Sequence, residues 1–407
     1  MVAVGQESFR TDINPALLYY QAFLMAPEPM SQADMDYLGT KDGHSWKLPE
    51  RYGKIVAGYD SQFQLLRQAA RSTAPCDWGI DTSAGAATLL PHLARAKAVA
   101  VAVGTRVPWE LQQGRQAEAR DDLLTTFVLG RNVSRDGTLI SALVQMAIEN
   151  MIGWDVAEHF GQFSSETLKQ LVDGFDAAPA RGTVAGCVPT ETALFQDLLV
   201  RKIQEIQKAN PGDDAKTMAA LHELATALVD PHPTTALLPN GDLDPTGWWE
   251  LFAKAAGGTS QGAINLIRDL KPMDQKLAVI AALPYARFEK ESKAFRAEIQ
   301  ESPNPLVSQL IPAWERGRRR EFRTEVCLAM IRAAVEYKLH GDSGFLSVAD
   351  PCGQGPFVLR RFVLQGVDRG FQLTSALEAT DSNSLIFVEK EGNPFRVGGP
   401  FVGKAIE

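Results

Sequence analysis

Apolar residues recur every three or four positions through most of the first 340 residues, the spacing that gathers them on one face of an α-helix. Short polar or Pro/Gly-containing segments separate these runs. The pattern predicts helices over 15–25, 31–38, 54–71, 89–113, 117–133, 138–161, from 165, over 190–209 and 215–229, from 248, from 260, over 273–301 and over 305–340. The 273–301 segment is either one helix or two helices joined at Pro284.

Capping residues support several of these boundaries. Asn14 precedes Pro15, and Ser31 opens the second helix. Asparagine and serine are favoured N-caps, and proline is favoured at the first helical position. We expect the first helix to end before Pro27, because a residue that precedes proline avoids helical backbone angles.

After Gly341 the period changes. Segments around 357–364, 370–375 and 385–388 alternate or cluster apolar residues between turn residues, which is typical of short strands. A sheet this small must pack on the helices to be stable. The sequence therefore predicts a mainly α fold of antiparallel helical hairpins with a small C-terminal antiparallel β-sheet.

One of these hairpins is similar to a tetratricopeptide-type pair. Its helices, 89–113 and 117–133, are joined by a tight turn at Gly114, with small residues such as Ala98 and Ala102 where the helices cross. A repeat array needs about three or more units, and no period of about 34 residues is visible. We therefore interpret it as a single tetratricopeptide-like pair.

A Pro/Gly-rich connection at 230–247 divides the helical body. We expect an N-terminal helical domain over 1–229, a second helical segment packed on it over 230–340, and a small β-rich segment over 341–407.

The segment 329–376, with "DPCGQGPF" and "GFQLTS", resembles the C-terminus of a family of uncharacterised, exported bacterial proteins. Its layout is also similar to the C-terminal sheet of type II secretion pseudopilins. Pseudopilins carry an N-terminal membrane helix that this sequence lacks, so the resemblance implies no function. From the residues alone, Asp350-Pro351 and Gly355-Pro356 are turn formers, and we interpret the stretch as a hinge rather than a binding loop.

Composition narrows the class of protein. Apolar residues make up 45% and charged residues 22%, as in ordinary globular chains. A net charge of −8 argues against a nucleic-acid partner. The basic run from Arg316 to Arg320 is interpreted as a solvated, ion-paired helix face. No run of about 18 apolar residues is present, so we expect no membrane-spanning segment.

The residues near the N-terminus leave localisation open. Ala3-Val4-Gly5 resembles a signal-peptidase site, and an extracytoplasmic protein is expected if the chain is a processed form. Otherwise we expect a cytoplasmic protein.

Four cysteines lack the spacing of a zinc site, and a Cys76–Cys187 disulfide is an open alternative. No phosphate-binding loop, dinucleotide fingerprint or serine-nucleophile elbow occurs in the sequence. We therefore predict no metal and no cofactor.

Three residues of "CDWGID", namely Asp77, Trp78 and Asp81, share one turn. They form either a corner that binds a sugar or a cation, or a buried tryptophan flanked by turn-capping aspartates. We favour the second interpretation. His92 is similarly more typical of a hydrogen-bonded core histidine than of a ligand.

Trp248 and Trp249, beside the Pro-rich connection, are the best candidates for exposed aromatic residues on a binding surface. Glu149, Asp155, Glu158 and His159 lie on one predicted helix, where we expect a solvated, ion-paired face.

Two functions remain. The first is a non-catalytic binding or scaffold protein that holds an unknown protein or small molecule in a helical-hairpin groove. The second is an unrecognised hydrolase with an acidic, histidine-containing cleft. Convergence of His92 or His159 with Asp77 or Asp81 would favour the hydrolase, and a groove lined by aromatic and amide side chains would favour binding. We favour binding.

Overall fold

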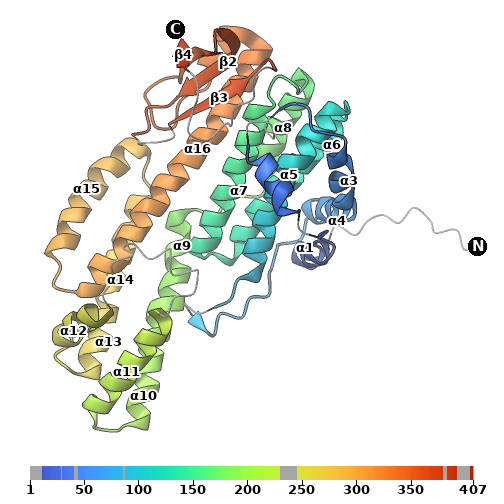
Figure 1. The fold of residues 1–407 in the computed structure, drawn as a ribbon. Helices are drawn as coiled ribbons and strands as arrows, with labels where there is room; N and C mark the ends of the chain where they lie inside the picture. The colour runs from blue at the N-terminus through green and yellow to red at the C-terminus, as the bar shows by residue number, and fades with distance from the viewer. Residues whose placement is uncertain are drawn as a thin grey trace, which may run out of the picture.

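The structure is a computed structural model that describes residues 12–28, 30–40, 45–85, 88–229, 245–378, 383–391 and 404–406. Within these ranges it contains sixteen α-helices and one small antiparallel sheet, and 69% of the residues are helical. The predicted fold class, mainly α with a small C-terminal sheet, is confirmed (Figure 1).

The N-terminal half contains α1 (Pro15–Leu24), α2 (Gln32–Leu38), α3 (Arg51–Gly58), α4 (Asp60–Ala70), α5 (Pro91–Gln112), α6 (Gln116–Val133), α7 (Leu139–Glu158) and α8 (Ser165–Ala177). The remaining helices are α9 (Val184–Glu191), α10 (Leu198–Ala209), α11 (Asp214–Val229), α12 (Pro245–Ala255), α13 (Ser260–Arg268), α14 (Leu270–Ala281), α15 (Tyr285–Glu301) and α16 (Pro305–Leu346).

The predicted helix starts at Asn14 and Ser31 are confirmed by their capping bonds. The Asn14 side chain accepts a hydrogen bond from the backbone N–H of Ala16, and the Ser31 hydroxyl accepts one from the N–H of Asp34. The expected 54–71 helix is two helices, α3 and α4, which meet at Tyr59. Pro284 separates α14 from α15, as one of the two alternatives expected.

The predicted 190–209 helix is only part of a longer helical stretch. Helix α9 already begins at Val184, and a π-helical segment, Thr192–Asp197, joins it to α10. Helix α16 is interrupted where the sequence predicted its end: Gly341, directly after His340, has non-helical angles of φ 63° and ψ −149°, and a short further helical segment continues to Leu346.

Helix α7 lies at the centre of the helical body and packs against α5, α6, α9 and α16. It approaches α16 closely at Gly153, where a Cβ atom would lie 2.5 Å from the Sγ of Cys327. No helix in the described ranges combines the length and apolar character needed to cross a membrane. Cys76 and Cys187 are both free cysteines, so the disulfide considered from the sequence is not formed.

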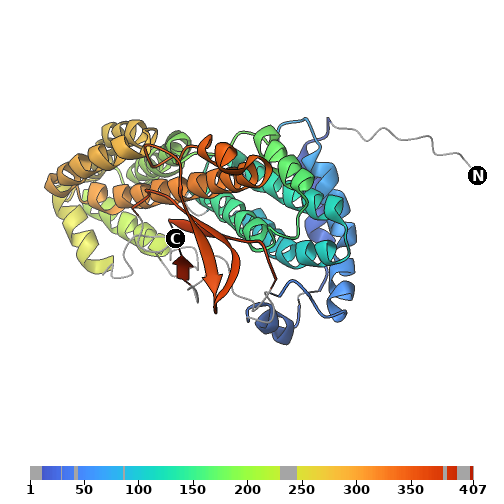
Figure 2. The same cartoon turned by 90° about the horizontal axis from the view of Figure 1, so that it is seen from above.

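The sheet has strand order β3-β2-β1-β4, with all neighbours antiparallel. Its strands are β1 (Val358–Leu364), β2 (Val367–Thr374), β3 (Ser384–Val388) and β4 (Lys404–Ile406). A two-residue turn, Gln365-Gly366, joins β1 to β2 with positive φ at both positions. Figure 2 shows the strands on one side of α16.

The sheet docks on the helices through aromatic rings, as its small size requires. Phe371 of β2 and Phe387 of β3 both contact Phe160, which follows α7, and Phe371 also contacts Tyr337 of α16. Phe357 and Phe362 are buried as well. The sheet is therefore part of the fold's main core.

Asp350 joins the end of α16 to this sheet. Its buried carboxylate accepts hydrogen bonds from the backbone N–H groups of Cys352 and Ala376 and from the Ser375 hydroxyl. These bonds hold the turn after α16 against the end of β2, the role that the sequence predicted for this hinge.

Candidate functional site

The structure brings two of the predicted site residues, Trp78 and His92, together in the core. The Trp78 side chain is 4% exposed, and its ring stacks on that of His92 with centroids 4.4 Å apart. Tyr19 and Phe23 of α1 stack on the same indole, and its Nε1 donates a 2.8 Å hydrogen bond to the Asn132 carbonyl. The burial of Trp78 that the structural interpretation requires is therefore observed.

Asp77 and Asp81 are exposed turn residues. The Asp77 carboxylate accepts a hydrogen bond from the N–H of Gly79, and the Asp81 carboxylate accepts one from the N–H of Ser83. Hydrogen bonding from Ser83 lowers the pKa of Asp81. Both carboxylates thus cap their own turn.

His92 is a core residue, as expected, but it is not hydrogen-bonded. Neither ring nitrogen has a hydrogen-bond partner within the described ranges. Nε2 lies 3.9 Å from an Asp136 carboxylate oxygen, which is too long for a hydrogen bond. Burial lowers the pKa of His92, and the Asp136 charge opposes this effect. The imidazole is therefore held as a neutral, stacked ring.

Trp248 and Trp249 lie on α12, at the opposite end of the molecule from the sheet (Figure 1). Both are half-buried. Trp249 stacks on His222 of α11, with centroids 4.7 Å apart, and Trp248 stacks on Phe252. The six predicted residues therefore form no single site.

The expectation of a solvated face on α7 is wrong. Glu149, Glu158 and His159 are all buried, because α7 is surrounded by other helices and reaches the sheet at its C-terminal end. Glu149 pairs with Arg131 of α6 at 2.6 Å and with Arg181 at 3.0 Å. Burial raises the pKa of Glu149, and the two arginines oppose this increase.

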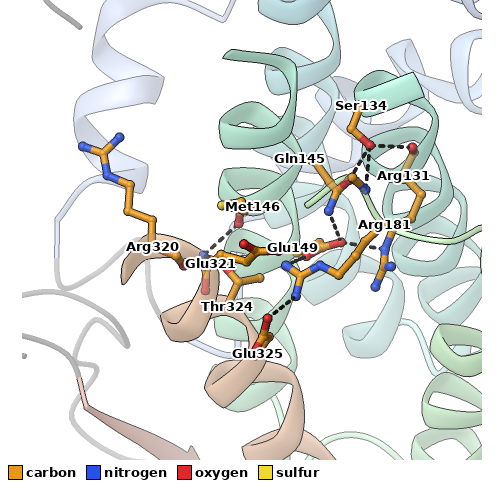
Figure 3. Close-up of polar contacts among 12 residues, drawn as sticks. Arg131, Ser134, Gln145, Met146, Glu149, Arg181, Arg320, Glu321, Thr324 and Glu325 are labelled. Carbon is orange, nitrogen blue, oxygen red and sulfur yellow. Dashed lines mark hydrogen bonds and ion pairs between the residues drawn. The ribbon is translucent and has the colours of Figure 1, made fainter. Parts of the chain in front are cut away.

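Figure 3 shows how this buried network continues on both sides of Glu149. On one side, Gln145 contacts Ser134 and accepts a hydrogen bond from the Gly182 N–H. On the other, Arg181 approaches Glu325 of α16. The network ties α6, α7 and α16 to the segment between α8 and α9, and its charges are mutually paired, which is the arrangement of a structural core.

The basic run 316–320 is only partly the solvated face that was expected. Arg318 is buried and pairs with Glu321 and Glu325, each at 2.9 Å. Arg319 pairs with Glu289 and Glu315. Ion pairing is confirmed for these two arginines, but Arg318 belongs to the interior.

An open cleft of about 800 Å³ lies between α3, α4 and the α5–α6 hairpin, which appear together in Figure 1. Five basic and four acidic side chains line it, together with one tryptophan. The lining residues are Glu50, Arg51, Gly53, Lys54, Val56, Ala57, Asp60, Arg67, Arg106, Trp109, Glu110, Arg115 and Glu118.

The floor of the cleft is a fixed cluster of charges. Arg106, 3% exposed, donates to the Asp122 carboxylate at 2.8 Å, to the Val56 carbonyl and to Asp60. Arg67 pairs with the other oxygen of Asp122. Burial opposes the charge on Arg106, but Asp122 and Asp60 outweigh it and raise the pKa of Arg106. The floor is therefore charged and immobilised by hydrogen bonds.

Trp109 forms one wall of the cleft. It is half-buried, and α3 packs directly on its ring at Gly53, where a Cβ atom would lie 2.5 Å from the indole Cζ2. Only glycine permits this approach, so the sequence sets the distance between α3 and α5 at this point.

Cysteine and histidine side chains do not line this cleft. Burial raises the pKa of each thiol, Cys76, Cys187, Cys327 and Cys352, to about 12, so all four are protonated at neutral pH. Within the described ranges, no group of three or more histidine, cysteine or carboxylate side chains is arranged to hold a metal ion.

The residues that build the cleft come from four helices and share no motif, so no pattern in the sequence marks them as a site. One signal was available. Arg106 interrupts the apolar run "AVAVAVGTRVPW", and a buried arginine in such a helix requires a carboxylate partner.

Comparisons with models of protein families, with curated proteins and with solved structures found no match to this chain.

Proposed function

We propose that this protein is a non-catalytic binding protein that holds its ligand in the cleft between α3, α4 and the α5–α6 hairpin. The observation that carries the proposal is the combination of an open, polar cleft with a floor fixed by the Arg106–Asp122–Arg67 cluster. Ligands bind in concave sites, where precisely placed polar groups fix their orientation.

The rigidity of the floor favours binding. Arg106 is already fixed by three partners before any ligand arrives, so little side-chain freedom is lost on association. Lys54 and Glu118 at the cleft are exposed and remain available to a ligand. The tetratricopeptide-like description of α5–α6 belongs to this proposal, since that hairpin forms one side of the cleft.

The hydrolase alternative receives less support. His92 stacks on Trp78, and His159 is buried next to Gln162, so the two histidines lie in separate parts of the core. Asp77 and Asp81 point their carboxylates into their own turns.

The composition of the cleft differs from the binding groove that we expected. It is lined mainly by charged side chains and Trp109 rather than by aromatic and amide groups.

The resemblance of segment 329–376 to exported bacterial proteins remains a proposal about origin and localisation. This resemblance does not involve the cleft. The residues that line the cleft all precede position 119, and Asp122 lies beneath its floor.

A blocked cleft tests the proposed function. Ala57 is exposed and lines the cleft, so Ala57→Trp places an indole in the space without removing a core contact. Ala297→Trp, at an exposed alanine of α15, is the matched control. Each protein is purified from the cells that make it, and small molecules and peptides released on denaturation are identified by mass spectrometry.

We expect a ligand that is retained by the wild type and by Ala297→Trp to be absent from Ala57→Trp, with the melting temperatures of all three unchanged. Retention of the same ligand at the same stoichiometry by Ala57→Trp would place the binding site elsewhere.

A further inference from the structure

Arg67 has hydrogen-bonding capacity that the fold does not use. One Nη donates to the buried Asp122 carboxylate, but the buried Nε has no hydrogen-bond partner within the described ranges. A guanidinium carries five N–H donors in a planar fork, and a buried donor without a partner is unfavourable. The enclosed Nε cannot be reached from the cleft, but Arg67 lines the cleft with its side chain 28% exposed, so a ligand there can accept hydrogen bonds from the outer N–H groups of the fork.

The charges around Arg67 favour an anionic acceptor. Arg67 and Arg106 share one buried carboxylate, Asp122. The other neighbour, Asp60, lies toward solvent with its side chain 66% exposed, where water screens its charge. The two guanidinium groups at the floor of the cleft therefore share a single fully buried counter-charge, the Asp122 carboxylate.

Acidic residues limit the size of that anion. Glu110 is engaged by Arg115, but Glu50 and Glu118 also line the cleft and would repel a large polyanion. The half-buried Trp109 ring offers apolar surface to the rest of the ligand.

From this arrangement we infer that the cleft binds a small oxyanion, a carboxylate or a phosphate, attached to an apolar or aromatic body, with the anion on Arg67 and the body against Trp109. The inference rests on the proposed function, because it names the chemical class of the ligand in the same cleft. Arginine suits this task, since its fork matches the geometry of both carboxylate and phosphate oxygens.

Three probes of similar shape test the class of ligand on the full chain. Phenylacetate and phenyl phosphate carry an oxyanion, and phenylacetamide is the neutral counterpart of the first. Binding is followed by the shift of the Trp109 indole N–H signal in ¹H–¹⁵N spectra, which is assigned with Trp109→Phe. We expect at least one of the two anions to bind about tenfold or more tightly than the amide, as a charge-assisted hydrogen bond predicts.

Arg67→Gln should reduce the affinity for that anion to the level of the amide. Arg332→Gln, at an arginine that pairs with Asp176 on another part of the surface, should leave it unchanged. Arg67→Lys, which keeps the charge but loses the fork, should give an intermediate affinity and serves if Arg67→Gln does not fold.

Equal binding of phenylacetate, phenyl phosphate and phenylacetamide would overturn the oxyanion inference, and so would unchanged anion affinity in Arg67→Gln. Shifts of the Trp109 signal by all three probes alike would reject the anion while leaving the cleft as a binding site. The proposed function fails separately, if the blocked Ala57→Trp protein retains its native ligand.

Discussion

At the scale of single residues, Trp78 organises the N-terminal helices around one ring. Its indole contacts Tyr19, Phe23 and His92, and its Nε1 bonds to Asn132 at the end of α6. From the sequence we favoured a buried ring at this position, because turn-capping aspartates flank the tryptophan. The structure adds that the ring joins α1, α5 and α6.

Trp78→Ala should therefore lower the free energy of unfolding by about 3–5 kcal/mol, the usual cost of emptying a buried aromatic site. Trp78→Phe keeps an aromatic ring but loses the hydrogen bond to the Asn132 carbonyl. We expect it to lower the free energy of unfolding by less than Trp78→Ala does: about 1 kcal/mol for the lost hydrogen bond, together with a contribution from the smaller buried area of the ring. Denaturant unfolding measures both. Wild-type stability in Trp78→Ala would show that the ring is not a core element.

Asp155 gives the protein a pH dependence of a particular sign. Its carboxylate lies against α5, where a Cβ on Gly104 would be 3.4 Å away. Burial, assisted by the charge of Glu158, raises its pKa well above the ordinary value. The folded protein therefore keeps this proton to a higher pH than the unfolded chain, and the associated stability is lost as pH rises through the folded pKa.

Asp155→Asn, which cannot ionise, should reduce the fall in stability as pH rises above about 4, the ordinary pKa of an aspartate in the unfolded chain. The lowered pKa of His92 acts in the opposite sense at acidic pH, but it is common to both proteins and cancels in the comparison. Melting temperatures across this range provide the measurement. Parallel curves for the two proteins would show that Asp155 does not titrate differently in the folded state.

At the scale of elements, the junction between α16 and the sheet depends on Asp350. Its carboxylate satisfies the Cys352 and Ala376 N–H groups and the Ser375 hydroxyl. Asp350→Ala should cost about 1–3 kcal/mol, because these donors lose their acceptor in a buried position. Asp342→Ala, at an exposed position eight residues earlier, should change stability by less than about 0.5 kcal/mol.

Urea unfolding followed by circular dichroism compares the two variants. If Asp350→Ala were as stable as Asp342→Ala, the turn would be held by its proline and glycine residues alone.

At the scale of the whole molecule, local signals were sufficient for the fold class. Asn14, Ser31 and Pro284 mark helix boundaries through bonds or clashes within a few residues, and the change of period after Gly341 marks the sheet. The interior charges were not predictable in the same way. Glu149 is buried because four other helices, α5, α6, α9 and α16, pack around α7, which no spacing within α7 reveals.

The candidate site was harder to predict for the same reason. Trp78 and His92 are neighbours in the fold, but the cleft depends on Arg67 of α4 and on Arg106 and Trp109 of α5, which tertiary packing brings together.

The burial of helix α7, in contrast, had a signal in its overall composition. It holds few charged residues in a largely apolar sequence, and a helix that is apolar on most sides is usually buried.

The central claim is that the ligand occupies the cleft between α3, α4 and the α5–α6 hairpin. Amide hydrogen exchange of the protein with its co-purified ligand, compared with the same protein after the ligand is removed, tests it most directly. We predict slower exchange in residues 50–60 and 106–118 when the ligand is bound. Protection confined to other segments, such as α11 and α12 around Trp249, would contradict the account.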